Sequence, residues 1–496
     1  MAFDDIYRWA KSQPDKAAMI YNGQTLSYAT LARGIEASRR FLERLNPPAG
    51  MVAIVVLQNI ADSWINIHAL RALGLTTICV PNIASARALK IRNAACIVTT
   101  EAEQHTQTIH ESDLQGMPLI VMPSALYANI FAGEIPQPPI GAPPLGGHIL
   151  YTSGTTGSFK KVLMEGHIEK ARNEARALSQ GFDMGSIDHG LDFGIWSGAG
   201  FKQPSAIWHA GGTEIIDQRP DAIDHFFDHR FTKTGILPIA MDRLIKHQEM
   251  HADFRRPSFD FQISHSGGFM TKRLADKVVE KLTPDFQVTF SATEFIRVPL
   301  TSKYETLDDL HWLKPVAGSA AEIVNDNDAP CPAGEEGYVR VLLTDVDASG
   351  YLDDPDATAR FFRHGYFYPG DLGVQRADGA VRILGRSGDV LNVRGSKLAV
   401  APLEQRVQEQ LNVETVCLFS GLDKTGVEEL VVVIEGERAP SRDEMQKLTA
   451  VFSQFERLRF EMMRKFPRTE AGMQKIKRAE IRKLVFPTDA NQGDTQ

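Results

Sequence analysis

Strand-length runs of apolar residues alternate with helical segments near the start of the chain. Residues 51–57 (MVAIVVL) form one such run, 61–74 (ADSWINIHALRALG) show helical spacing, and 76–82 (TTICVPN) return to a strand pattern. Two further runs follow at 95–100 (ACIVTT) and 118–122 (PLIVM). Strands without polar alternation are buried on both faces, which is typical of a mostly parallel sheet covered by helices. The pattern predicts an α/β fold.

The two ends of the chain have patterns of their own. Residues 17–28 (AAMIYNGQTLSY) contain two strand runs around an Asn-Gly turn, which predicts a β-hairpin. In the last hundred residues, strand runs at 415–421 and 429–436 lie between helical patterns at 401–411 and at 441–457. We expect these to form a compact α+β unit.

Charge and composition narrow the class of protein. The 496 residues carry a formal net charge of −8, with 43% hydrophobic and 23% charged residues. This argues against nucleic acid or an anionic membrane as the main partner. The chain starts with an acidic segment, not an apolar leader, and no apolar run reaches the length of a membrane span, so we expect a cytoplasmic protein. The four cysteines form no C-x-x-C pair, which fits reduced thiols.

The most distinctive motif is YTSGTTGSFKK, residues 151–161. Glycine lets the backbone approach a ligand closely, while hydroxyls, exposed N–H groups and lysine bind anions. The stretch is therefore a candidate phosphate cradle, although a flexible polar linker has a similar composition. Its spacing does not match the G-x-x-x-x-G-K-[ST] loop of P-loop NTPases.

The same stretch closely resembles the phosphate-binding signature of the adenylate-forming superfamily, which includes acyl- and aryl-CoA ligases, adenylation domains and luciferases. Residues 153–157 and Lys160 match that signature, whereas Phe159 and Lys161 replace its usual proline and glycine. The resemblance implies that ATP phosphates bind to a set of residues here, namely Thr152, Ser153, Gly154, Thr155, Thr156, Gly157 and Lys160.

A second segment, FSATEF (290–295), is similar to the Tyr-Gly-x-Thr-Glu motif of the superfamily. The resemblance implies that Phe290, followed by Ser291, stacks on adenine. It also implies that Thr293 contacts the phosphate and that Glu294 holds Mg²⁺. Taken alone, Glu294 also fits a solvated surface acid.

Two more segments match nucleotide-binding motifs of the superfamily. Gly267 and Gly268 correspond to a turn that passes along adenine. In GYFYPGDLG (365–373), Asp371 corresponds to the aspartate that accepts hydrogen bonds from both ribose hydroxyls, and Arg386 adds a further ribose contact. A carboxylate suits a diol because it offers only acceptors, in a fixed fork.

The resemblance also implies a mobile C-terminal domain that carries an essential lysine. Gly388 stands at the hinge, so we predict a large N-terminal domain of mostly parallel sheets covered by helices (1–387) and a small mobile α+β domain (388–496). In FPRTEAGMQKIKRAEIRKL the essential lysine falls on Lys475, with Lys477 as the alternative. Its cation would neutralise charge that builds up between the substrate carboxylate and the α-phosphate.

The acid-binding pocket is less clearly defined by the sequence. Amino-acid adenylation domains carry an aspartate for the substrate ammonium in the region that reads DFGIWSGAGF in this chain. Asp192 stays an open candidate for that role. Trp196 occupies the place where aryl-CoA ligases often have a histidine, and Phe193, Ile296 and Arg297 are further candidates for the lining. Ordinary core packing is the alternative for each. The set favours a compact aromatic or medium-sized acid.

Together the motifs predict an ATP-dependent acid–CoA ligase that uses ATP, Mg²⁺ and coenzyme A. One alternative within the same chemistry loads the acyl group onto a carrier protein. Another is a nucleotide-binding regulatory homologue without turnover, suggested by the departures at Phe159, Lys161 and Phe290. The superfamily resemblance also leaves a homodimer open.

Overall fold

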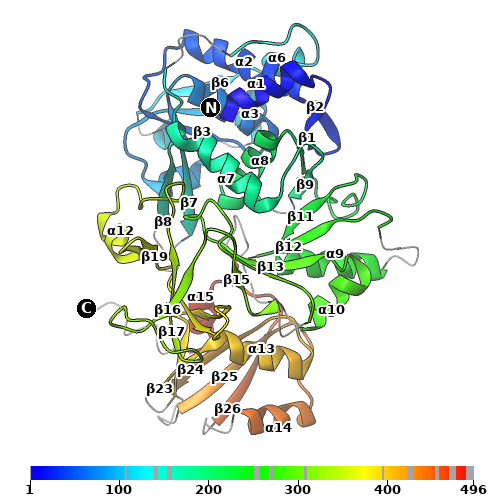
Figure 1. Cartoon of the computed structure of the whole chain (residues 1–496), viewed down its shortest axis with the longest axis vertical. Helices are drawn as coiled ribbons and strands as arrows, with labels where there is room; N and C mark the ends of the chain where they lie inside the picture. The colour runs from blue at the N-terminus through cyan, green and yellow to red at the C-terminus, as the bar shows by residue number, and fades with distance from the viewer. Residues whose placement is uncertain are drawn as a thin grey trace. The chain divides into compact units, whose positions relative to one another are not determined.

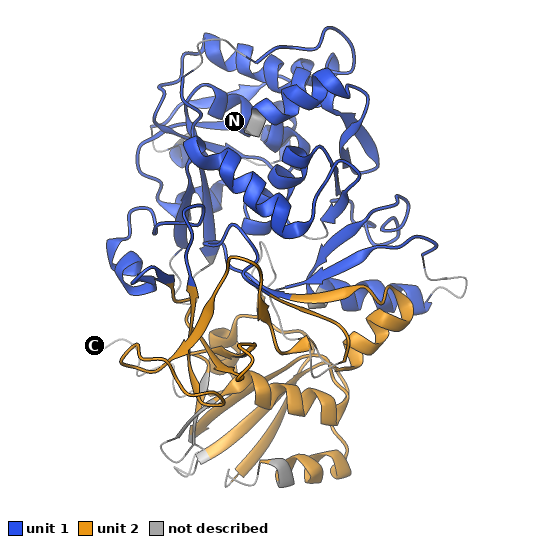
Figure 2. Ribbon diagram, in the orientation of Figure 1, with its two compact units in different colours: residues 1–266, 289–300, 342–366 blue, residues 267–288, 301–341, 367–496 orange. Residues whose placement is uncertain are grey.

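The computed structural model describes residues 2–106, 109–114, 116–138, 143–153, 159–190, 193–250, 257–266, 270, 272–306, 310–393, 396–422, 428–452, 457–468 and 476–486. The chain forms two compact units (Figure 2). Unit 1 comprises residues 1–266, 289–300 and 342–366, and unit 2 comprises 267–288, 301–341 and 367–496.

A six-stranded sheet in unit 1 contains the apolar runs of the first part of the chain. Its strand order is β6-β5-β3-β4-β7-β8, and every neighbouring pair is parallel except β7 and β8. The predicted buried parallel sheet is therefore confirmed. The strands are β3 (Val52–Val56), β4 (Thr76–Val80), β5 (Ala94–Thr100), β6 (Leu119–Met122), β7 (His148–Ser153) and β8 (Phe159–Met164).

A second sheet of unit 1 has the order β12-β11-β9-β10-β1-β2 among the strands that lie wholly in that unit. Strands β1 and β2 form the predicted hairpin, and Asn22 and Gly23 at its turn have φ values of 50° and 81°. Both values suit an Asn-Gly type I′ turn. The strands are β1 (Ala17–Tyr21), β2 (Gln24–Ser27), β9 (Ile187–Gly190), β10 (Thr213–Ile216), β11 (Lys233–Ile236) and β12 (Gln262–His265).

Helices separate the two sheets of unit 1. Helix α3 packs on β3 and β4, and helix α8 packs on β9 and β10. The two helices meet through Trp64 and Trp208, whose rings contact edge to face at 4.8 Å. Figure 1 shows α7 next to α8 in the same unit. The helices of unit 1 are α1 (Ala2–Ser12), α2 (Tyr28–Arg44), α3 (Ile60–Ala72), α4 (Ile83–Leu89), α5 (Glu101–Thr106), η1 (Glu111–Asp113), α6 (Ala125–Ala128), η2 (Gly166–Ile168), α7 (Glu169–Gln180), α8 (Gly198–Ala210), α9 (Pro238–Met250) and α12 (Pro355–Phe361).

Unit 2 contains an antiparallel sheet in which β16, β17, β20 and β21 are neighbours in that order. The strands are β15 (Lys314–Pro315), β16 (Ala321–Val324), β17 (Glu336–Leu342), β20 (Asp371–Gln375) and β21 (Val381–Arg386), with helix α10 (Lys272–Lys281) before them. The remaining strands of this part of the chain are β13 (Phe286–Phe290), β14 (Leu300–Lys303), β18 (Phe362–Arg363) and β19 (Tyr366–Phe367).

The last hundred residues form the predicted α+β structure around the sheet β24-β25-β26. One apolar cluster joins this sheet to α13 and α14, and a second cluster joins it to α15, so the central strand β25 is buried on both faces. The elements are β22 (Val390–Val393), β23 (Ser396–Ala399), α13 (Val400–Leu411), β24 (Val416–Leu422), β25 (Glu428–Glu435), α14 (Arg442–Val451), β26 (Arg457–Met463) and α15 (Arg478–Val485).

One boundary in this region was wrong. The helix expected over 441–457 ends at Val451, and Arg457 begins strand β26, which pairs in parallel with β25. Ser441 caps the helix, because its hydroxyl accepts from the Glu444 N–H while the Glu444 carboxylate accepts from the Ser441 N–H.

All four cysteines of the chain are free thiols. Within the described residues, none of the helices is both long enough and apolar enough to cross a membrane.

Two carboxyl groups face each other inside unit 1. Asp188 on β9 and Glu214 on β10 are register partners, and only 1% and 2% of their surfaces are exposed. Burial raises the pKa of both, and the charge of Asp188 raises the pKa of Glu214 further. Since two like charges on register partners oppose each other's ionisation, the pair holds a proton to higher pH than isolated carboxyl groups do.

This pair should make the protein less stable as the pH rises. Its pKa values in the folded state lie above the values of about 4 expected in the unfolded chain. From about pH 4 upward the folded state therefore binds more protons, and the free energy of unfolding falls with rising pH. We expect Glu214→Gln to flatten this slope in urea unfolding between pH 5 and pH 8. The exposed Glu43→Gln is the control; equal slopes for wild type and Glu214→Gln would contradict the prediction.

Candidate active site

The predicted phosphate loop connects two antiparallel strands. In the β7–β8 hairpin, Thr152 lies opposite Lys160, and Ser153 lies opposite Phe159. The loop residues Gly154, Thr155, Thr156 and Gly157 lie outside the described residues. The hairpin thus places the two ends of the loop side by side, with Lys160 at the start of the returning strand.

Lys160 lies among aromatic side chains. Its Nζ is 3.6 Å from the centroid of the Phe361 ring and 5.2 Å from that of the Tyr351 ring. The negative faces of such rings attract an ammonium group. Phe361 ends helix α12, so the contact holds this lysine to a segment about two hundred residues further along the chain.

Lys161, which replaces the usual glycine, connects strand β8 to the segment before α12. Its Nζ is 3.5 Å from Asp353, and its carbonyl accepts a hydrogen bond of 2.8 Å from the Leu352 N–H. Phe159, which replaces the usual proline, contacts Tyr151 edge to face at 5.6 Å. Both departures from the signature therefore make contacts of their own at the base of the loop.

Glu294 follows β13 and is 5% exposed. The Tyr351 hydroxyl donates to its Oε1 at 2.6 Å. Since the Tyr351 ring also contacts Lys160, one residue joins the predicted phosphate-binding lysine to the predicted Mg²⁺ ligand. The structure therefore brings these two motifs together within unit 1.

The backbone around Glu294 is held from several sides. The Ala348 N–H donates to the Glu294 carbonyl at 2.9 Å, and the Ile296 N–H donates to the Asp347 carboxylate at 2.7 Å. Arg176 on α7 donates to the Ile296 carbonyl at 2.8 Å. The predicted pocket residue Ile296 is buried, and both its N–H and its carbonyl take part in these hydrogen bonds.

A further support of this loop comes from Lys202 on α8. Its Nζ donates to three carbonyls of the same loop, those of Ala292 at 3.1 Å, Thr293 at 3.2 Å and Phe295 at 2.6 Å. Lys202 is 6% exposed. Burial lowers its pKa to about 7, and the Arg176 guanidinium acts in the same direction.

The predicted acid-pocket residues Phe193 and Trp196 lie in the turn before α8. A Cβ on Gly194 would be 2.2 Å from the Trp196 ring, so the indole lies directly against that backbone. A Cβ on Gly198, in the first turn of α8, would be 3.0 Å from the Thr293 Oγ1. The turn that carries Trp196 and the loop that carries Thr293 are therefore in contact.

Other predicted residues of this region differ in exposure. Phe290, at the end of β13, is half-buried, as is Arg297, while Ser291 is exposed. Phe193 lies close to Gly235 at the end of β11, since a Cβ there would be 3.5 Å from its ring. Asp192 lies outside the described residues.

In unit 2, the predicted ribose-binding residues are register partners. Asp371 begins β20 and Arg386 ends β21, and the Arg386 Nε is 3.3 Å from the Asp371 carboxylate. Arg386 also donates to the Pro369 carbonyl. The Asp371 carboxylate is buried, so its position is fixed by the surrounding protein. The Arg386 guanidinium is half exposed and remains accessible from solvent.

The structure describes some of the other residues predicted for unit 2 and not the rest. Gly388 lies in an exposed turn after β21, where a Cβ would meet nothing within 4 Å. Gly267, Gly268 and Lys475 lie outside the described residues. Lys477, the alternative lysine, precedes α15, and its Nζ is 3.0 Å from Glu480.

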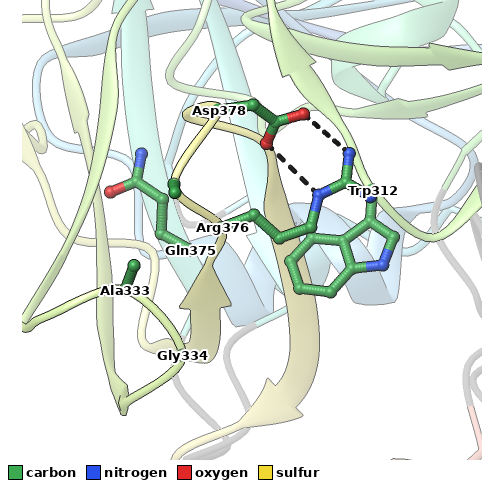
Figure 3. Close-up of a pocket in the computed structure, with 7 residues that line it drawn as sticks. Trp312, Ala333, Gly334, Gln375, Arg376 and Asp378 are labelled. Atoms are coloured by element: carbon green, nitrogen blue, oxygen red, sulfur yellow. Dashed lines mark hydrogen bonds and ion pairs between the residues drawn. The ribbon is translucent and has the colours of Figure 1, made fainter.

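A surface pocket of unit 2 is lined by none of these motif residues. Figure 3 shows Arg376 between the Trp312 ring and Asp378. The guanidinium is 4.6 Å from the ring centroid and donates to both oxygens of Asp378 at 3.2 and 2.9 Å. Because these charged groups bind each other, we assign the pocket no role.

The family model described as AMP-binding enzyme matches residues 6–352. The chain belongs to this family. The match covers the hairpin with Lys160 and the loop with Glu294, and it ends one residue after Tyr351. The superfamily resemblance inferred from the motifs is thereby confirmed, and so is the fold class.

Curated relatives of this AMP-binding family member are distant. Bacitracin synthase 1 of Bacillus licheniformis is 26% identical over 318 residues, which cover 60% of this chain and 6% of that protein. Indoleacetate–CoA ligase of Aromatoleum aromaticum is 26% identical over 372 residues, which cover 71% of this chain and 69% of that protein. The chain spans between 5% and 22% of the first five synthases and synthetases that it matches.

Solved structures resemble the family member over almost its whole length. The anthranilate CoA ligase AuaEII in complex with anthranoyl-AMP has a TM-score of 0.82 at 16% identity, covering 99% of this chain and 98% of that one. The o-succinylbenzoate CoA synthetase of Bacillus subtilis in complex with its acyl-adenylate has a TM-score of 0.79 at 19% identity, covering 96% and 97%. At these identities the likeness shows a shared fold.

Sequence reasoning missed the residues that hold the site together, Tyr351, Asp347 and Lys202. A signal for Lys202 was present, because a lysine in the mostly apolar stretch GAGFKQPSAIW of a buried helix needs partners. Tyr351 and Asp347 gave none, since their partner Glu294 and its neighbour Ile296 are about fifty residues away in the sequence.

Proposed function

We propose that this protein activates a carboxylic acid with ATP and Mg²⁺ as an acyl-adenylate and then transfers the acyl group to the thiol of coenzyme A. The observation that carries the proposal is Tyr351, which contacts both Lys160 and Glu294. A cation beside the phosphate loop and a carboxylate for Mg²⁺ are the two groups that nucleotide activation needs on the phosphate side. The CoA ligases among its relatives support the same reaction.

The chemistry has two steps. A carboxylate oxygen of the acid attacks the α-phosphorus of ATP, and the bond to the β-phosphate oxygen breaks, which releases pyrophosphate. The thiolate of CoA then attacks the acyl carbon, and AMP leaves. Lys160 would bind the departing phosphates, and Lys475 would offset charge between the carboxylate and the α-phosphate. Asp371 and Arg386 would hold the ribose, and Phe290 would stack on adenine.

Glu294 has the chemistry that Mg²⁺ requires. Its Oε1 accepts from Tyr351, while no described residue donates to its Oε2. Hard carboxylate oxygens are preferred Mg²⁺ ligands, and the hydroxyl of the adjacent Thr293 would contact the phosphate. A bound Mg²⁺ would neutralise phosphate charge, and the role of the chain is to hold Glu294 in a fixed position through Tyr351.

The acceptor thiol distinguishes a CoA ligase from an enzyme that loads a carrier protein, and both acceptors are tested because synthases and synthetases are among the relatives. The decisive experiment measures pyrophosphate release with ATP and Mg²⁺ across aryl and alkyl acids, with and without CoA. Release that needs one class of acid supports the activation step. Thioester formed only with CoA supports the ligase, and adenylate without CoA turnover supports carrier loading. ATP binding without release for any acid would contradict the proposal and favour a regulatory homologue.

Trp196 should limit the size of the acid. Since its ring lies against Gly194 beside the Thr293 loop, we expect Trp196→Ala to open space there and shift the preference toward bulkier acids. The rank order of acids in pyrophosphate release measures this. Trp312→Ala, in the surface pocket of unit 2, is the matched control and should keep the wild-type order. An unchanged order in Trp196→Ala would place the indole in the core and outside the pocket.

A further inference from the structure

Lys202 is a buried cation that the reaction described above does not use. It lies in the second turn of α8, and its three donors meet three backbone carbonyls of one loop, those of Ala292, Thr293 and Phe295. An ammonium group has three N–H donors, so this loop satisfies it completely. The side chain is 6% exposed, so water does not compete for these bonds.

Holding a charge at this depth opposes folding. A methionine would fill similar space without this cost. The lysine is therefore costly for stability, and what it contributes is a fixed conformation for the loop that presents Thr293 and Glu294.

The same helix also carries the acid-binding turn. Trp196 lies two residues before α8, and Gly198 in its first turn packs on Thr293. Lys202 is one turn further along, where its bonds to the loop begin. The turn for the acid and the loop for Mg²⁺ are thus joined twice, by close packing at Gly198 and by the ammonium of Lys202.

We propose that Lys202 is a positioning residue that fixes the Thr293–Glu294 loop for Mg²⁺ binding and holds it in register with the acid-binding turn. The inference rests on the proposed function, because it takes Glu294 as the Mg²⁺ ligand. Residues that orient a metal ligand typically change metal affinity or activity by about 10- to 100-fold when they are replaced.

The test compares Lys202→Met with Lys202→Arg and with Ser205→Ala. Ser205 lies on the same helix, and its hydroxyl donates to the Phe201 carbonyl within that helix, so it controls for a general effect on α8. The first measurement is the Mg²⁺ dependence of ATP binding by calorimetry. We expect Lys202→Met to need about tenfold more Mg²⁺ for half-maximal binding, Lys202→Arg to recover part of this, and Ser205→Ala to match wild type.

The second measurement is pyrophosphate release at saturating acid. A fall in kcat with little change in the KM for the acid is the result expected from a displaced metal loop.

An unchanged Mg²⁺ requirement in a folded Lys202→Met protein would overturn the proposal. If Lys202→Met does not fold, Lys202→Arg decides the question. A Lys202→Arg protein of wild-type stability with a raised Mg²⁺ requirement would support the proposal, and one with a wild-type requirement would overturn it. Wild-type ATP binding without release for any acid would refute the ligase and leave the Mg²⁺ comparison intact.

Discussion

Glu294→Gln should reduce pyrophosphate release by about 100-fold, because the variant loses the negative charge that we propose as the ligand of Mg²⁺. The amide oxygen of glutamine can still accept from the Tyr351 hydroxyl, so the buried contact of 2.6 Å is kept and the fold is expected to survive. The measurement is the rate of release as a function of Mg²⁺ concentration, with thermal unfolding as the check on the fold.

Tyr351→Phe is the matched variant for this experiment. It removes the hydroxyl that orients Glu294 but keeps the ring beside Lys160. We expect a smaller loss, about tenfold, that is partly overcome by raising Mg²⁺. A Glu294→Gln enzyme with wild-type rate and Mg²⁺ dependence would refute the assignment of Glu294 as the metal ligand.

Lys475→Ala should have a comparable effect on the first step, roughly 100-fold or more, since no other cation is assigned to the charge between the carboxylate and the α-phosphate. The comparison with Lys477→Ala tests which of the two lysines has this role. Lys477 lies 3.0 Å from Glu480, so its charge is already paired, and its removal should cost little activity.

Single-turnover formation of the acyl-adenylate separates these two variants, because it reports the first step alone. If Lys477→Ala lost activity and Lys475→Ala kept it, the role would belong to Lys477. If both variants kept wild-type rates, the lysine would lie outside this segment altogether.

The sequence was most informative where local chemistry decides structure. The Asn22–Gly23 turn requires positive φ at both residues, and the structure has them. The buried runs became β3 to β6 because continuous apolar strands must be covered on both faces. The strand β26 was also readable in principle, since RLRFEMM alternates between polar and apolar residues over most of its length, but the helix expected upstream was carried as far as its first residue, Arg457.

The site was predicted residue by residue only where a motif is contiguous. Lys160 and Glu294 each lie in a short signature, and the structure connects them through Tyr351. The connection itself could not be read from the sequence, because a tyrosine in DASGYLDD has no local feature that points to a carboxylate about fifty residues earlier. Long-range partners of this kind are fixed by packing and not by neighbours in the chain.

The way the Glu294 loop is held has a consequence for how activity arises during folding. Its supports are Lys202, Arg176, Asp347 and Tyr351, which are separated from their partners in the loop by 93, 120, 51 and 57 residues. Contacts of such separation close large loops, so they form after local helices and hairpins. During refolding, the circular dichroism signal of the helices should therefore recover before the ability to bind Mg²⁺ and ATP. A newly made chain would pass through an intermediate that has its secondary structure but no activity.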